Sequence, residues 1–386
     1  MSRLEELIAE LCPDGVEYVR LAECCDIEDN KRKPVKSSLR IPGDTPYYGA
    51  NNIQDYVEGY THYGQYVLIA EDGSASLENY SVQYVDGFFW ANNHVHVIKG
   101  RKDLDTKFLY YYLTSFNFIP FLTGGTRAKL NKGNMEEIPI PLPPIPVQQE
   151  IVRILDDLSE SIKEITTQLT NELTARRKQY EYYRDMLLSF SQEVEWDILG
   201  NCIIQNIGGG TPSKSILSYW NGNIPWASVK DVVSQNMLLS QTQDFISEEG
   251  LENSTSNIVK AGDIIIATRI NPGKMLIAAK DIAINQDLRG LKLKPNIHPK
   301  FLVYYFQTLS IEGKGTTVKG ISIKELESIR IPIPPLKEQE RIVSILDRLD
   351  ALYNDVFDSI SAEIDARQKQ YEYYRDKLLT FKEVKS

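Results

Sequence analysis

Apolar and aromatic residues recur at steps of three and four positions along two long segments of the chain. No glycine or proline follows Val147 before Gly200, and none follows Leu336. Such steps are typical of the a and d positions of a coiled coil, so each segment is predicted to be one helix. About 40 residues rise roughly 60 Å, far more than a domain needs for its own core. The first stripe contains Ile151, Leu155, Leu158, Ile162, Ile165, Leu169, Leu173, Tyr180, Tyr183 and Leu187; the second contains Ile342, Leu346, Leu349, Tyr353, Val356, Ile360, Ile364, Tyr371, Tyr374 and Leu378.

The two segments are near-copies of each other. Residues 138–190 and 329–381 match at a constant offset of 191, whereas the stretches before them differ. This repeat predicts an internal two-fold arrangement in which the second helix returns antiparallel along the first, so that the matching stripes cover each other. Two independent helices, each packed on its own domain, are an alternative that their length disfavours. We expect globular domains at residues 1–142 and 193–333, and long helices at residues 143–192 and 334–386.

The repeated hexapeptide YEYYRD divides between two faces of each helix. Tyr180 and Tyr183 fall on the apolar stripe and are expected to pack in the seam. An aromatic residue beside an arginine, off the seam, has the composition of an interface anchor, although plain solvent exposure explains such a pair equally well. The predicted partner-binding residues are Tyr182, Arg184, Tyr373 and Arg375.

The globular stretches are predicted to be mixed α/β, with short strands and few helices. Strand-like runs lie at residues 66–70, 88–100, 263–270 and 290–294, and short helices are expected at residues 108–116 and 301–309. The whole chain is therefore expected to be two α+β domains joined by two long antiparallel coiled-coil helices.

Basic, amide, hydroxyl and aromatic residues in these stretches are candidates for reading DNA, because such groups contact phosphates and base edges. Each one taken singly is more often a turn or surface residue, so the prediction concerns the face that they form together. The first-domain candidates are Lys31, Arg32, Lys33, Lys36, Tyr47, Asn51, Asn52, Asn92, Asn93, Arg127 and Lys129. The second-domain candidates are Thr211, Ser213, Lys214, Trp220, Lys230, Arg269, Lys274, Arg289 and Lys319.

The charge of the chain complicates a DNA-binding role. The net charge is −10 and the isoelectric point about 5.2, which alone argues against a nucleic-acid binder. The repeated segments are acidic, which suits a basic protein partner. The four cysteines show neither CxxC pairs nor a disulfide framework, and neither a membrane-spanning run nor a signal peptide is recognisable. We therefore expect a cytoplasmic protein that does not act at a membrane.

Motifs of catalysis are missing from the sequence. The run GGGTPSK lacks the spacing of a phosphate-binding loop, and the pair His94 and His96 is expected to be structural. No nucleophile elbow occurs, and the two Pro-Pro pairs are not preceded by the Asn or Asp of an adenine-methylase loop. We expect no catalytic residue, no metal site and no cofactor bound by this chain.

Two unlike domains, each followed by a PIPP…Q…IV.ILD entry into a long helix, resemble the specificity subunit of type I restriction–modification systems. The segments GGGTPS…YWNGNIPW, KGISIKELESIRIPIPPLKEQERIVSILDRLD and LCPDGVEYVRLAE carry the same resemblance, although the first domain lacks the GGGTPS loop. The resemblance implies two target recognition domains, each reading one half of a split double-stranded DNA sequence. It further implies that the helices set the gap between the halves and bind two methylation subunits, which hold S-adenosylmethionine, and that restriction subunits join through that complex.

Three hypotheses follow. The first is a non-catalytic DNA-recognition scaffold, and the second, a self-sufficient DNA-modifying enzyme, is disfavoured by the missing motifs. The third is a coiled-coil protein-interaction scaffold without direct DNA binding, which the acidic isoelectric point would also fit. A gel shift with the chain alone and with a methylation subunit separates the first from the third. The sequence does not indicate which bases are read or how long the gap is.

Overall fold

The computed structural model describes residues 2–124, 128–191, 193–233, 237–315 and 319–384. Two compact units divide the chain: Met1–Thr170 with Ile360–Ser386, and Asn171–Ser359. Each unit contains one α+β domain and a part of both long helices, α5 (Ile145–Leu187) and α9 (Leu336–Leu379). The two long helices and the two α+β domains confirm the predicted fold class.

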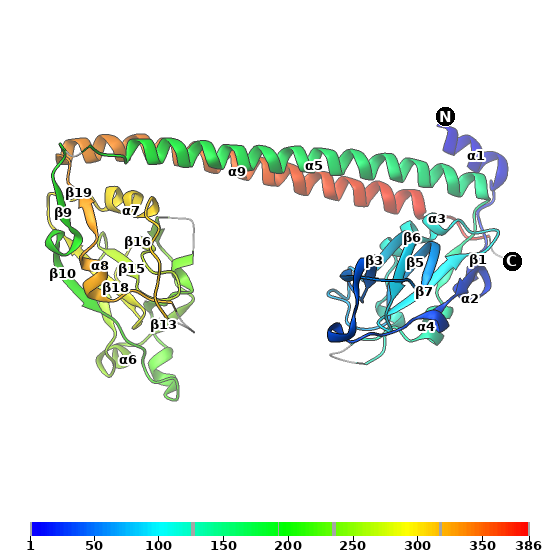
Figure 1. Cartoon of the computed structure of the whole chain (residues 1–386), viewed down its shortest axis with the longest axis horizontal. Coiled ribbons are helices and arrows are strands. Elements are labelled where there is room, and N and C mark those ends of the chain that lie inside the picture. Colours follow the sequence, from blue (N-terminus) through cyan, green and yellow to red (C-terminus); the bar gives the residue numbers. More distant parts are fainter. Residues whose placement is uncertain (1, 125–127, 192, 234–236, 316–318, 385–386) are drawn as a thin grey trace. The chain divides into compact units, whose positions relative to one another are not determined.

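The domain of the first unit consists of strands, with short helices at its edges (Figure 1). Its elements are α1 (Arg3–Leu11), β1 (Tyr18–Arg20), α2 (Leu21–Cys24), β2 (Cys25–Ile27), β3 (Pro42–Tyr48), β4 (Ile53–Val57), β5 (His62–Ala70), β6 (Val82–Ala91), β7 (Val95–Gly100), α3 (Thr106–Ser115), α4 (Lys132–Glu136) and β8 (Pro139–Pro141). Six strands form one sheet in the order β2-β7-β5-β6-β3-β4, and β1 pairs with β8.

The six-stranded sheet curls strongly. His62 at the start of β5 pairs with Phe89 near the end of β6, whereas Ala70 at the end of β5 pairs with Val95 at the start of β7. Only residues 92–94 connect β6 to β7, and they reach about 14 Å, whereas a nine-residue strand runs about 30 Å. The strand ends must therefore bend towards each other. Gly64 and Gly87 pair at the bend with φ of 126° and 120°, which a side chain rarely allows.

The domain of the second unit keeps the same strand order in a broken form. Its elements are β9 (Trp196–Ile198), β10 (Ile203–Gly208), β11 (Ile224–Ala227), β12 (Leu238–Leu239), β13 (Asp244–Ile246), α6 (Glu248–Glu252), β14 (Asn257–Val259), β15 (Ile264–Ala267), β16 (Met275–Ala278), β17 (Ile282–Ile284), β18 (Leu288–Leu293), α7 (Pro299–Gln307), α8 (Ile323–Glu327) and β19 (Arg330–Pro332). At the position where β6 bends in the first domain, the corresponding strand of the second domain is interrupted and forms β16 and β17. Two sheets result, in the orders β10-β18-β15-β16-β12 and β13-β11-β17-β14.

Each long helix begins against its own domain through one buried glutamine. The Nε2 group of Gln148 donates to the carbonyls of Pro143 (2.7 Å) and Asp103 (2.9 Å), and its Oε1 accepts from the backbone N–H of Asp105 (2.8 Å). Its repeat copy, Gln339, makes the equivalent three bonds in the second unit. Both side chains are fully buried. In each unit these bonds join the domain to the first turn of the long helix that follows it.

In each unit a short helix of the domain then packs on the long helix that begins with this glutamine. In the first unit α3 lies between the sheet and the long helices (Figure 1), where Lys107 and Tyr111 contact Asp156 of α5 at 2.8 and 2.6 Å. In the second unit Lys300 and Tyr304 of α7 contact Asp347 of α9 at 2.7 and 3.0 Å. The repeated sequence therefore builds one docking geometry twice.

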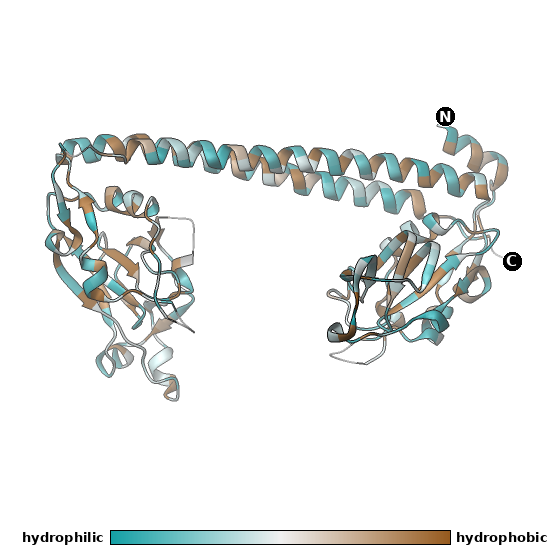
Figure 2. Ribbon diagram, viewed as in Figure 1, coloured by the Kyte–Doolittle hydropathy of each residue, from teal (hydrophilic) through white to brown (hydrophobic). Residues whose placement is uncertain are grey.

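Brown and teal residues alternate along both long helices in Figure 2, as the heptad pattern predicts. Within the second unit Tyr180 of α5 stacks on Tyr353 of α9, with ring centroids 5.4 Å apart, and the colours of Figure 1 show that the two helices run antiparallel there. One partner helix covers the seam only in part: Tyr183 and Tyr374, predicted to pack in it, keep 39% and 41% of their surface exposed. Among the described residues, no helix is long and apolar enough to cross a membrane.

Candidate nucleic-acid interface

Four connections meet at one place in the first domain, because the curled sheet brings several strand ends together. They are residues 49–52 after β3, 71–73 after β5, 92–94 after β6, and the described residues 123–124 and 128–130. The Nδ2 group of Asn51 donates to the carbonyl of Gly73 at 2.8 Å, and Nδ1 of His94 lies 2.6 Å from Oδ1 of Asp72. The backbone of Asp72 pairs with that of Lys129. These connections form one surface, the loop cluster of the first domain.

The second domain builds the same cluster from residues 228–231, 268–271 and 285–287 and from the described residues 314–315 and 319–321. Its backbone bonds are equivalent: Thr268 N–H donates to Asp287 (2.8 Å) as Glu71 N–H donates to His94 (2.9 Å). The N–H groups of Ile321 and Leu130, 191 positions apart, donate in turn to Thr268 and Glu71, each at 2.8 Å. One backbone framework therefore carries two different sets of side chains.

Several predicted residues lie on these clusters. In the first domain Asn51, Asn52 and Asn93 are exposed, and Lys129 is half-buried beside Glu71. In the second domain a cavity of about 690 Å³ gathers four predicted residues, Thr211, Lys214, Trp220 and Lys230. Ser213 lies between Thr211 and Lys214 in the sequence and is exposed, and its hydroxyl lies 2.8 Å from that of Ser215. Arg269 and Lys319 lie on the adjoining connections and are exposed.

The structure removes Tyr47 and Asn92 from the predicted face. Tyr47 is 1% exposed, and its hydroxyl accepts from the N–H of Val35 at 3.0 Å, so it belongs to the core. Asn92 is 3% exposed, and its Oδ1 accepts from the N–H of His94 at 2.7 Å, which shapes the connection after β6. The strand pattern around both residues did not reveal which side of the curled sheet they would face.

Of the basic run at residues 31–36, Arg32 is also corrected. Its side chain is 16% exposed and donates to Glu71 (2.7 Å) and to the carbonyl of Val95 (2.8 Å), so it fixes the strand ends from beneath. Lys31 is exposed and forms an ion pair with Glu28 at 2.7 Å. Lys33 and Lys36 are exposed and form no ion pair with any residue that the structure describes. Arg127 lies outside the described residues.

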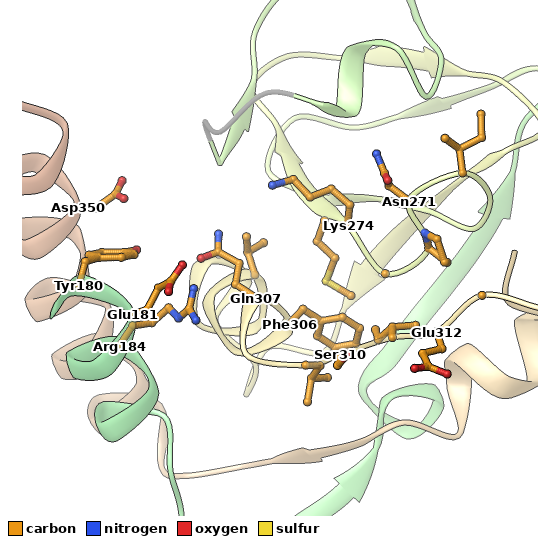
Figure 3. A pocket seen from close by; sticks show the side chains of 18 of the residues that line it. Tyr180, Glu181, Arg184, Asn271, Lys274, Phe306, Gln307, Ser310, Glu312 and Asp350 are labelled. Atoms are coloured by element: carbon orange, nitrogen blue, oxygen red, sulfur yellow. The ribbon is translucent and has the colours of Figure 1, made fainter. Parts of the chain in front are cut away.

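Two further predicted residues of the second domain are partly buried at the edge of its loop cluster. The Nε group of Arg289 donates to the side chain of Asn206 at 2.7 Å, and burial lowers the pKa of this arginine. Lys274 points into a cavity of about 910 Å³, on the wall opposite Tyr180 and Arg184 of α5 (Figure 3), and burial lowers its pKa. Ile270 and Lys319 of the loop cluster line the same cavity as Lys274.

Acidic groups beneath the first cluster are neutralised locally. Burial would raise the pKa of Glu71, but hydrogen bonds from Lys129 and Arg32 outweigh it and lower that pKa. Asp29 lies 2.6 Å from His96, and this contact likewise overcomes burial and lowers the pKa of Asp29. His94 and His96 thus bind separate carboxylates, as expected for structural histidines, and the described residues contain no cluster suited to a metal ion.

The acidic side chain and its partner exchange places between the rims of the two clusters. Asp72 and His94 of the first domain correspond to Arg269 and Asp287 of the second, where Nη1 of the arginine lies 3.3 Å from Oδ1 of the aspartate. The backbone at both places is equivalent, so the exchange changes the chemistry of the surface and leaves its shape. Sequence reasoning missed Asp72, Asp287 and Gln286; aligning the two halves through the strands, instead of only through the long helices, would have found them.

The predicted partner-binding residues form two matching patches, one in each unit. Tyr182 and Tyr373 are 65% and 62% exposed. Arg184 and Arg375 are instead mostly covered, at 13% and 16% side-chain exposure, since each pairs with the aspartate that follows it and lies 6.0 Å from a tyrosine ring of the seam. The tyrosines are therefore the exposed part of each patch, and the arginines support them.

Comparisons with known proteins agree with the doubled architecture. The family model described as type I restriction modification DNA specificity domain matches residues 13–175 and 201–366. The chain is 45% identical over 380 residues to a putative type I restriction enzyme specificity subunit of Haemophilus influenzae, covering 95% of this chain and 96% of the relative. It is 38% identical over 420 residues to the EcoR124I/EcoR124II specificity subunit of Escherichia coli, covering 99% and 97%.

The fold is also similar to a solved chain from work on complex assembly and conformational transition of the type I R-M system. The TM-score is 0.72 at 19% identity, covering 96% of this chain and 98% of the other.

Proposed function

Because the chain belongs to the family of type I restriction–modification specificity subunits, we propose that it recognises a bipartite DNA sequence, one half through each loop cluster. The observation that carries this proposal is the loop cluster built twice on one backbone framework with different side chains. Two readers of similar shape and different chemistry are what a split, asymmetric target requires. A scaffold without DNA binding is disfavoured by the family.

We assign no catalysis to this chain. The methylation chemistry and its S-adenosylmethionine would belong to two methylation subunits, and restriction subunits would join through that complex. The matching patches around Tyr182 and Tyr373 support two copies of one partner, since each patch repeats the residues and exposure of the other. We place the assembly in the cytoplasm, because its proposed substrate is double-stranded DNA.

Exchanging residues 1–137 for those of a relative with another target tests the separate readers. The expected result is that one half of the methylated sequence changes, while the other half and the gap stay the same. Mapping methylated adenines across a genome measures all three features at once. A change in both halves together would contradict independent readers. The reciprocal exchange of residues 194–328 is the control, and it should alter only the other half.

Replacing Lys214 by alanine should weaken DNA binding on every sequence alike. Lys214 is exposed, lines the cavity that also holds Lys230, and pairs with no carboxylate among the described residues, so it is free to contact a phosphate. Losing one such contact should lower the slope of log K against log salt by about 1. Titrations of the assembled complex at several salt concentrations measure this slope.

Lys292→Ala is the matched control for that experiment. Lys292 is an exposed lysine of β18, and the neighbouring β15 begins beside it, so it lies towards the end of the sheet remote from the cluster. Its loss should leave the slope unchanged. If Lys214→Ala relaxes one base position instead of lowering affinity uniformly, the lysine reads a base.

A further inference from the structure

The connection between β15 and β16 holds one residue in an unusual backbone conformation. Ile270 has φ of 69°, and every other described residue with positive φ is a glycine. A β-branched side chain is strongly disfavoured in this left-handed region, because its Cβ crowds the backbone. Such a conformation persists only where the surroundings impose it, and strained residues of this kind gather at functional sites.

The surroundings impose the conformation through backbone contacts. The N–H of Ile270 donates to the carbonyl of Lys319 at 2.9 Å, and Arg269 pairs with Gly320 in a β-bridge. The side chain itself contributes little to the core, since Ile270 is 58% exposed. Packing therefore does not explain why an isoleucine occupies this position.

The first domain provides an internal comparison. Its equivalent connection follows β5. The backbone bonds of Glu71 to His94 and of Leu130 to Glu71 in the first domain have counterparts in the second. These counterparts are the bonds of Thr268 to Asp287 and of Ile321 to Thr268. Counting from these bonds, Ile270 corresponds to Gly73, whose φ is 71°. The same backbone is thus made with glycine in one domain, where it carries no strain. The fold needs the left-handed conformation but not the isoleucine.

We infer that Ile270 is a specificity-determining residue of the second domain, which presents its side chain to the methyl group of a thymine. This inference rests on the proposed function. The thymine C5-methyl is the apolar group on the major-groove edge of the base pairs, and an exposed aliphatic side chain is its natural contact. The neighbouring Arg269 and Lys319 are exposed cations suited to the flanking phosphates. A strained, hydrogen-bonded loop holds the side chain in place, so little conformational entropy is lost on binding.

Ile270→Gly, in the full chain assembled with its methylation subunit, tests this role without endangering the fold. The variant should unfold at the same temperature as the parent or higher, because glycine removes the strain. Selection from a pool of duplexes with randomised positions should show one thymine in the second half becoming tolerant of other bases. The first half and the gap should stay unchanged.

Deoxyuridine at the relaxed position then isolates the methyl group. The parent complex should bind the deoxyuridine duplex about fourfold more weakly, as expected for losing one buried methyl, while Ile270→Gly should bind both duplexes equally. Ile204→Gly is the matched control: it removes another exposed isoleucine, on β10 and outside the loop cluster, and should leave the selected sequence unchanged.

The outcomes separate the inference from the proposed function. If the parent selects a bipartite sequence and Ile270→Gly selects the same one with equal affinity, the inference fails and DNA recognition stands. Uniform loss of affinity on all sequences, indifference of the parent to deoxyuridine, or a lower unfolding temperature of Ile270→Gly would also overturn it. If the parent complex selects no sequence at all, both fail.

Discussion

Replacing Gln148 by alanine should lower the free energy of unfolding of the first unit by roughly 3 to 5 kcal/mol. The side chain is fully buried, and its three hydrogen bonds satisfy two carbonyls and one backbone N–H, of which the bond to Pro143 is itself buried. A buried polar group left without its partner costs about 1 to 3 kcal/mol, and the shorter side chain also leaves a void. Thermal unfolding followed by circular dichroism or calorimetry measures the loss.

Gln149→Ala is the control for this substitution, because the next residue on the helix is an exposed glutamine. It should change the stability by less than about 0.5 kcal/mol. Gln339→Ala should destabilise the second unit as Gln148→Ala destabilises the first, since its three bonds are equivalent. Equal stability of Gln148→Ala and Gln149→Ala would show that the buried amide does not fasten the domain to its helix.

Inserting four residues after Leu169 should lengthen the unread gap of the DNA target by about two base pairs, if the helices set that gap as proposed. Four residues add about 6 Å and slightly more than one full turn, so the following residues return almost to their original face. Two base pairs of DNA have nearly the same length and rotate the second half-site by about 70°. Methylation mapping of the insertion variant reads the gap directly.

An insertion of two residues at the same site is the control. It turns everything beyond it by about 200°, which places apolar stripe residues on the wrong face. Sequence-specific methylation should then be lost by at least a hundredfold, or abolished. A four-residue insertion that methylates the original sequence with the original gap would exclude the helices as the ruler.

The long helices and their pairing could be predicted because their signals are local and repeated. The stripe from Ile151 to Leu187 and its copy predict helices that the structure places at Ile145–Leu187 and Leu336–Leu379. The exposed positions of Tyr182 and Tyr373 also follow from helical periodicity. Tyr183 and Tyr374 do line cavities with residues of the other long helix. They stay partly exposed, because periodicity gives the face of a side chain but not how much of it a single partner helix covers.

The recognition face was predicted only in part, because it depends on contacts between distant residues. Lys214 and Lys230 could be chosen by type, and the structure brings them to one cavity. Tyr47 and Arg32 were misplaced because the contacts that cover them form only in the folded chain: Tyr47 bonds to Val35, and Arg32 bonds to Glu71 and Val95. Ile270 carries no sequence signal of its own, since its strain appears only once the backbone angle is known.

The first unit is formed from two separate parts of the chain, and this has a consequence for how the protein is synthesised. Residues 360–386 belong to that unit, and in it the N–H of Val16 donates to Lys382 at 2.8 Å while the N–H of Val384 donates back to Val16 at 3.1 Å. A ribosome delivers the N-terminal domain first, yet the last residues that complete its unit come after the whole of the second unit has been synthesised. A nascent chain interrupted near residue 360 would therefore hold every residue of the second unit and lack part of the first.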